Sequence, residues 1–169
     1  MSHLDEHVDV GCALAQADVR LNHFFRAHGN ADGDTAKLTL AVDVNVSGFA
    51  TPLTLERSVI ATIQTHHLRA DMTPRYDLQW APQVSGPFPL FAGQLIVEAG
   101  DDYDTFVLHL RGDYTPPLGV LGKGFDLAVG HRLAQATAYN LLHRIRDFIE
   151  SEFARDEARK PHGEPQARS

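Results

Sequence analysis

The chain has 169 residues, enough for one domain that buries about 70% of the surface its unfolded form exposes. Its apolar content of 43% excludes an intrinsically disordered protein, which would hold too few apolar side chains to form a core. The 22 acidic residues outnumber the 15 lysines and arginines, and the net charge of -7 argues against nucleic acid as a partner, because phosphate binding needs a basic surface.

The N-terminal sequence and the single cysteine indicate the cellular compartment in which the protein is expected. Cys12 is the single cysteine, so we expect neither an intramolecular disulfide nor a thiolate metal cluster. The N-terminal sequence MSHLDEHVDV has no positively charged segment followed by an apolar one, and no run approaches the roughly 18 apolar residues of a membrane-spanning helix. We therefore expect no signal peptide, no membrane span and, by default, a cytoplasmic location.

Three segments are predicted along the chain. Residues 1–7 are expected to be a flexible lead, and residues 8–154 to form a single domain. Residues 155–169 mix charges with prolines and hold almost no apolar side chains, so a disordered tail is expected there. His3 and His7 have the spacing that would bind a metal on a helix, but no helix and no third ligand is predicted beside them.

Hydrophobic periodicity predicts one short helix and six strands before the long C-terminal helix. Apolar residues at helical spacing run from Ala17 to His28, and Gly29-Asn30 is a suitable stop for that helix. Strict alternation predicts a half-buried strand over residues 37–46. The other strands are expected at residues 8–14, 53–65, 76–81, 91–99 and 103–114.

The long C-terminal helix is predicted to organise the domain. Its amphipathic face is suited to covering a curved antiparallel sheet in a two-layer α+β domain. Small residues at positions 134, 136 and 138 keep the N-terminal half of this face thin, whereas bulky side chains from Leu141 onward fill the other half. The thin half either leaves a cavity or lets the sheet approach more closely. The apolar stripe comprises Leu127, Ala134, Ala138, Leu141, Ile145, Phe148 and Phe153, widened by Leu142 and Ile149.

Four segments share a pattern with a known superfamily. They are Trp80-Ala-Pro, Phe88-Pro-Leu-Phe-Ala-Gly-Gln-Leu, Gly112-Asp-Tyr-Thr-Pro-Pro-Leu-Gly and the C-terminal helix. Over residues 36–154 the chain thereby resembles the START-like, or SRPBCC, superfamily, and most of all its bacterial members described as polyketide cyclase-like or uncharacterised. The resemblance implies a helix-grip fold, in which a curved antiparallel sheet of six to seven strands packs on a long C-terminal helix around a hydrophobic cavity.

The resemblance also has departures, and it leaves the activity open. The family usually has two short helices after the first strand, whereas residues 16–28 offer room for one. Six strands are counted here, against the usual seven. Members include lipid carriers, hormone receptors and aromatase/cyclases, so a shared fold does not define one function.

Candidate catalytic chemistry centres on one histidine. His131 lies close to the apolar stripe near the thin part of the helix, where an acid or base would be paired with Asp113 or Tyr114. The alternative is a structural histidine held by hydrogen bonds. Residues 119–124 are glycine-rich but lack the Ser or Thr of a phosphate loop, because Phe125 stands there. No metal site, cofactor or nucleophilic triad is predicted.

Three functions are compatible with this sequence. The first is the binding of a hydrophobic small molecule or lipid in a cavity between the sheet and the C-terminal helix. The second is a cyclase- or dehydratase-like enzyme that uses the same pocket, and the third is a protein-interaction module whose cavity has closed. The bulky residues expected in the interior would either line a pocket or serve as core. They are Tyr76, Trp80, Phe91, Phe106, Leu108 and Leu141.

Overall fold

The computed structural model describes the backbone of residues 2–33, 35–46, 53–65, 74–83, 89–115 and 123–161. Side chains are described over residues 2–33, 35–40, 60–64, 74–83, 89–115 and 130–161. The elements follow one another as β1 (Ser2–Val10), a 3-10 turn η1 (Leu14–Gln16), α1 (Ala17–His28), β2 (Gly29–Asp32), β3 (Thr35–Val46), β4 (Leu53–Thr65), β5 (Arg75–Pro82), β6 (Leu90–Ala99), β7 (Phe106–Thr115) and α2 (Lys123–Arg159).

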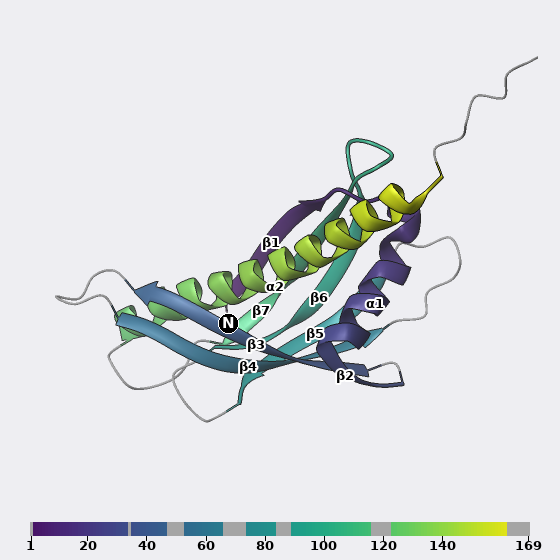
Figure 1. Ribbon diagram of the computed structural model, residues 1–169. Helices are drawn as coiled ribbons and strands as arrows, with labels where there is room; N and C mark the ends of the chain where they lie inside the picture. Colours follow the sequence, from purple (N-terminus) through teal and green to yellow (C-terminus); the bar gives the residue numbers. More distant parts are fainter. Residues whose placement is uncertain are drawn as a thin grey trace, which may run out of the picture.

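The described strands form one antiparallel sheet of seven, in the order β1-β7-β6-β5-β4-β3-β2. Neighbours in the sheet are also neighbours in the chain, except that the first strand pairs with the last. Figure 1 shows α2 running along the curved sheet, with α1 beside the C-terminal part of α2. The predicted α+β helix-grip architecture is confirmed.

Alternation along the strands determines which side chains face α2. On β5 the side chains of Tyr76, Leu78 and Trp80 are buried. Arg75, which precedes Tyr76, and Gln79, which lies between Leu78 and Trp80, are exposed. The predicted inward face of β7 is confirmed, because Phe106, Leu108 and Leu110 have no exposed surface. A strand covered on one face by helices shows this alternation because successive side chains point to opposite faces.

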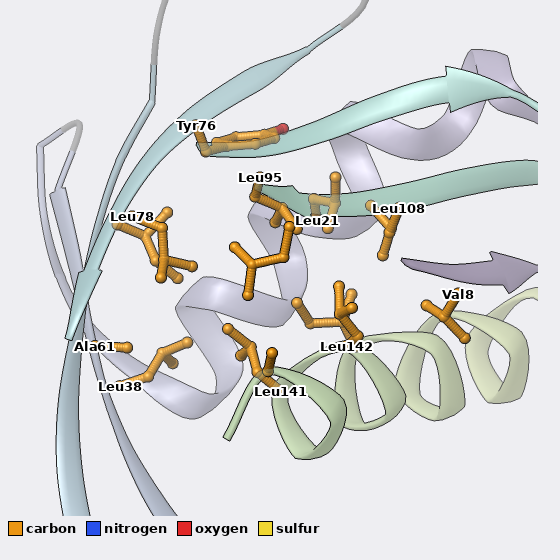
Figure 2. Packing of buried hydrophobic residues seen from close by; sticks show 14 of the residues in the cluster. Val8, Leu21, Leu38, Ala61, Tyr76, Leu78, Leu95, Leu108, Leu141 and Leu142 are labelled. Atoms are coloured by element: carbon orange, nitrogen blue, oxygen red, sulfur yellow. The ribbon is translucent and has the colours of Figure 1, made fainter. Parts of the chain in front are cut away.

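Helix α2 contributes the other half of the core. Figure 2 shows Leu141 and Leu142 pointing toward leucines of the sheet, among them Leu95 and Leu108. The predicted stripe is largely confirmed, although Phe148 and Phe153 are only half-buried and the side chain of Leu127 lies outside the described residues. No helix in the described ranges is long and apolar enough to cross a membrane. The buried face comprises Leu133, Ala134, Thr137, Ala138, Leu141, Leu142, Ile145 and Ile149.

The N-terminus differs from the prediction. Residues 2–7, expected to be a flexible lead, form most of β1, which ends at Val10 instead of continuing to residue 14. Leu4, Val8 and Val10 are buried on the inner face, but Glu6 interrupts this series and hides the alternation in the sequence. Since β1 pairs along its whole length with the distant strand β7, no local pattern could reveal the partner.

Two other boundaries also differ. Gly29–Asp32, whose first two residues were predicted to stop the preceding helix, forms the edge strand β2 in a hairpin with β3. Its last three side chains are exposed, so it carries no apolar alternation. At the other end, α2 continues to Arg159, where a disordered tail was expected from residue 155. Residues 162–169 lie outside the described residues.

A glycine pair lets β6 and β7 approach each other closely. Gly93 and Gly112 are cross-strand partners on the inner face. A Cβ on Gly112 would lie 2.5 Å from the carbonyl oxygen of Ala92 and 2.5 Å from Cα of Gly93. It would also lie 2.8 Å from the ring of Phe91, which extends over both glycines. Glycine in a strand interior marks such a close approach.

Replacing Gly112 by alanine is therefore expected to destabilise the protein by about 1–3 kcal/mol, because backbone atoms that cannot rotate away must shift. Urea unfolding measures this loss. Gly33→Asn is the matched control: Gly33 has a φ of 57°, which asparagine tolerates, and no atom lies within 4 Å of its would-be Cβ. Equal losses for the two variants would contradict the close-approach explanation.

Candidate functional site

Three aromatic side chains lie in a row across the inner face of the sheet. Strand register places Trp80 of β5 opposite Phe91 of β6, and Phe91 opposite Tyr114 of β7. The rings of Trp80 and Phe91 stack with centroids 4.1 Å apart and an interplanar angle of 15°. All three residues are at most 3% exposed. We call Trp80, Phe91 and Tyr114 the aromatic row.

A small residue adjoins the row on its β4 side. Ala61 is paired with Trp80, and Leu38 of β3 is paired with Ala61. Both are buried. Cross-strand partners are the closest neighbours on a sheet face, so the indole of Trp80 has a large aromatic ring on one side and a single methyl group on the other.

The other expected ligand-binding residues lie elsewhere in the same core. Tyr76 is at the opposite end of β5 from Trp80 and donates its hydroxyl proton to Asp18 of α1, at 2.7 Å. Phe106 and Tyr114 lie at opposite ends of β7, about 25 Å apart along the strand. The expected residues are therefore all buried, but they cannot all contact one small molecule. Trp80 and Phe91 are the two that the structure brings together with Tyr114.

Tyr114 connects this interior to the helix. Its hydroxyl lies 2.9 Å from Nδ1 of His131, on α2. Tyr114 is 2% exposed, whereas the ring of His131, expected in an apolar setting, is exposed. When Nε2 carries the imidazole proton, Nδ1 accepts a hydrogen bond from the phenol. The pair thus joins a buried hydroxyl to a nitrogen-bearing ring that solvent reaches.

Asp113 does not belong to this pair. Adjacent residues on a strand point to opposite faces, so Asp113 points outward where Tyr114 points inward. Its carboxylate is exposed and lies 3.4 Å from Nδ1 of His3 on β1. Of the two partners that the sequence offered for His131, the structure brings Tyr114 into contact and directs Asp113 to the outer face.

The side chain of Trp80 carries an unused hydrogen-bond donor. Its Nε1 is buried and has no hydrogen-bond partner within the described part of the chain. An indole nitrogen can only donate, and a buried donor without a partner loses its bonds to water without replacement, at a cost of about 1–3 kcal/mol. Nothing in the sequence marks this donor, because its lack of a partner depends on the packing of four strands and a helix.

Small side chains of α2 lie close to the row. His131 contacts Tyr114, and the residues three and seven positions further on the same helix face are Ala134 and Ala138. Both are fully buried, as is Thr137, whose hydroxyl donates to the carbonyl oxygen of Leu133 at 2.7 Å. We call Ala134–Ala138 the slim section. The Pro-Pro-Leu-Gly segment after Thr115 lies outside the described residues.

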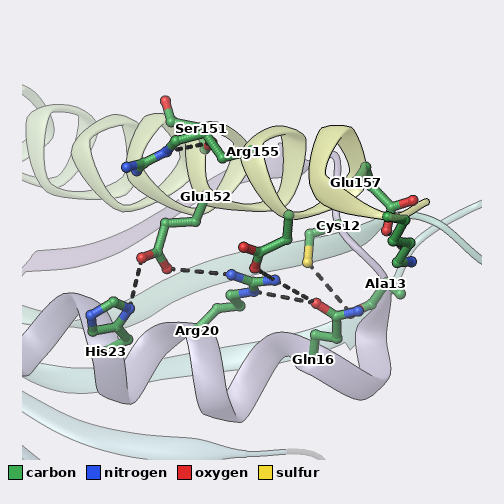
Figure 3. A network of polar contacts seen from close by, with 11 residues as sticks. Cys12, Ala13, Gln16, Arg20, His23, Ser151, Glu152, Arg155 and Glu157 are labelled. Carbon is green, nitrogen blue, oxygen red and sulfur yellow. Dashed lines mark hydrogen bonds and ion pairs between the residues drawn. The ribbon is translucent and has the colours of Figure 1, made fainter.

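A second polar cluster joins α1 to α2 (Figure 3). The guanidinium of Arg20 lies 2.6 Å from Asp156 and 3.5 Å from Glu152, and Glu152 also lies 2.7 Å from Nδ1 of His23. The hydrogen bond from Arg20 holds the pKa of the Asp156 carboxyl below its usual range. Every charge named here faces an opposite charge or a hydrogen-bonding group. We therefore interpret the cluster as a structural contact that holds α1 against α2.

The histidines of the outer sheet face also lie within a network of charges. The rings of His7 and His109 are 5.5 Å apart on paired strands, and Nε2 of His109 lies 3.1 Å from Glu98. Arg111 joins Glu98 to Asp5. In the described part of the chain no group of three or more His, Cys, Asp or Glu is arranged to hold a metal ion.

Cys12 is buried beneath the turn that follows β1. Burial raises the pKa of its thiol, which keeps it protonated and a poor nucleophile. No partner base was predicted for it, and the structure places only the Ala13 carbonyl oxygen within hydrogen-bonding reach, at 3.8 Å, in the described region.

Comparison with known proteins establishes the fold alone. The protein TTHA0849 of Thermus thermophilus superimposes with a TM-score of 0.55 at 10% sequence identity, covering 89% of this chain and 99% of its own. A conserved protein from Geobacillus kaustophilus gives 0.54 at 14% identity, covering 92% and 97%. A START superfamily protein from Mycobacterium smegmatis gives 0.43 at 14% identity, covering 86% and 97%. No family model and no curated protein matches the sequence.

The likeness of this chain to the Thermus and Geobacillus proteins is one of fold. At such identities, fold does not carry a ligand or a reaction from one protein to another.

Proposed function

We propose that this protein binds a hydrophobic small molecule or lipid between the sheet and α2, at the aromatic row. The observation that carries the proposal is the buried Nε1 of Trp80, which has no hydrogen-bond partner among the described residues, within a largely apolar face. A core that only had to be stable would gain nothing from placing a donor there. A bound molecule would use the aromatic surface for burial and the donor for orientation.

The slim section supports the same location. Aromatic side chains each offer about 150–250 Å² of surface, and the row presents three of them from adjacent strands. On α2, after His131, which contacts Tyr114 of the row, Ala134 and Ala138 fill less volume than the leucines and isoleucines further along the helix. The helix therefore presents small side chains close to its contact with Tyr114, the α2 end of the row.

Native mass spectrometry of protein purified gently from its own host tests the proposal. A small molecule should appear as an added mass that is lost on denaturation. Ala138→Leu, which adds bulk to the slim section, should remove this added mass and leave the melting temperature equal or higher, because the new side chain replaces the ligand. Gln135→Leu is the matched control, since it adds the same side chain at an exposed position of the same helix.

The opposite result would favour the closed interaction module. In a filled core, Ala138→Leu is overpacked and should cost about 1–3 kcal/mol, with no added mass in the wild-type protein. That combination would contradict ligand binding at the slim section.

The Tyr114–His131 pair favours a second candidate function, a cyclase- or dehydratase-like enzyme. A protonated His131 would donate from Nδ1 to the Tyr114 oxygen, and Tyr114 would pass its own proton to a carbonyl oxygen of the bound molecule. His131 is exposed, so solvent could restore its proton after each turnover. The pair would act as a general acid whose inner member meets the ligand and whose outer member meets water.

Tyr114→Phe and His131→Gln separate catalysis from structure. If the pair is catalytic, each variant should abolish conversion of the molecule identified by mass spectrometry while the melting temperature stays nearly unchanged. His143→Gln is the control, because His143 lies on the same helix and its Nδ1 contacts a backbone oxygen, that of Tyr139. Loss of stability in the first two variants, with conversion retained by the remaining folded protein, would assign the pair a structural role.

A further inference from the structure

We infer that the molecule bound at the aromatic row is uncharged and carries one oxygen, of a ketone, ester or hydroxyl, that accepts a hydrogen bond from Trp80. This inference rests on the proposed function and adds to it the chemical class of the ligand. It follows from which polar groups the described interior holds and which of them are already used.

Among the described side chains, one buried donor has no hydrogen-bond partner. Thr137 is the one buried polar residue of the described chain apart from the aromatic hydroxyls and the indole, and its proton goes to Leu133. The Tyr76 hydroxyl donates to Asp18, and the Tyr114 hydroxyl contacts His131. Nε1 of Trp80 has no partner within the part of the chain that the structure describes. One free donor calls for one acceptor.

The charge of the ligand follows from the absence of buried cations. No Lys, Arg or His is buried among the described side chains, and the cation nearest to burial, Arg20, is paired with Asp156 and Glu152 at the α1–α2 junction. A carboxylate beside Trp80 would lose its water without gaining a counterion, which is far more costly than burying a carbonyl. A neutral acceptor therefore fits this site, and a fatty acid anion does not.

A trapped water is the rival occupant. Buried waters typically make about three hydrogen bonds to groups that have no other partner. Within the described chain, the other buried side-chain atom without a hydrogen bond is Oε2 of Glu152, which faces Arg20 at the junction with α1. Trp80 thus offers a trapped water one hydrogen bond. A ligand with an apolar body accepts the same hydrogen bond and is further stabilised by burial of that body against the aromatic row.

The single tryptophan makes the inference directly measurable. Trp80 is the one Trp of the chain, so its indole N–H gives a single resonance in a ¹⁵N–¹H correlation spectrum. We would titrate the full-length protein with 2-acetylnaphthalene, with 2-ethylnaphthalene, which lacks the acceptor, and with 2-naphthoate, which is charged. The ketone should move the indole resonance downfield, and the hydrocarbon should bind without that shift.

Trp80→Phe supplies the matched variant. It keeps an aromatic ring but removes the donor, so the ratio of ketone affinity to hydrocarbon affinity should fall about tenfold relative to wild type. The indole measurement is made on wild-type protein, and it decides the question even if this variant folds poorly. Gly33→Asn, at a position where no atom lies within 4 Å of a would-be Cβ, controls for handling of the variants.

The outcomes distinguish failure of this inference from failure of the proposed function on which it rests. If none of the three probes binds, the proposed function fails together with the inference. If hydrocarbon and ketone bind but the indole resonance does not move and Trp80→Phe leaves their ratio unchanged, the inference is overturned while ligand binding stands. Tightest binding of the naphthoate, or an indole whose only contact is a water, would also overturn it.

Discussion

Burial of one face of α2 along the concave side of a seven-stranded sheet is the constraint on which the described structure depends. The sheet supplies Tyr76, Leu95 and Leu108 to this contact, and the helix supplies the buried residues between Leu133 and Ile149. Pairing of β1 with β7 completes the sheet, and the Arg20–Asp156 ion pair holds α1 against the C-terminal end of α2. Since the sheet curves, the helix cannot fill the space below it uniformly with side chains of equal size.

The unequal filling accounts for the location of the candidate site. Toward its C-terminal half α2 presents leucines and isoleucines and forms ordinary core, whereas the slim section directly follows His131, which contacts Tyr114 of the aromatic row. Gly93 and Gly112 leave room for the ring of Phe91, which in turn stacks on Trp80. The orientation of the Trp80 indole thus follows from the packing of Phe91 over the glycine pair and from the small side chains of the slim section.

The sequence predicts those parts of the fold that local hydrophobic periodicity determines. Alternation identified the inward face of β7, and helical spacing located α1 and the face of α2. Features that depend on distant partners were out of reach: Glu6 hid the alternation of β1, and the exposed strand β2 had none. For the site, the sequence placed Tyr114 near His131 but could not exclude Asp113, because facing at a strand end depends on register. Whether Trp80 has a hydrogen-bond partner is a property of the packed interior alone.

A crystal structure of the protein grown with 2-acetylnaphthalene tests the central claim most directly, because it locates the ligand and its oxygen together. The account predicts density for the two fused rings between the aromatic row and the slim section, with the ketone oxygen about 2.9 Å from Nε1 of Trp80. An interior closed by protein side chains, with the ligand absent or bound on the outer face of the sheet, would contradict it.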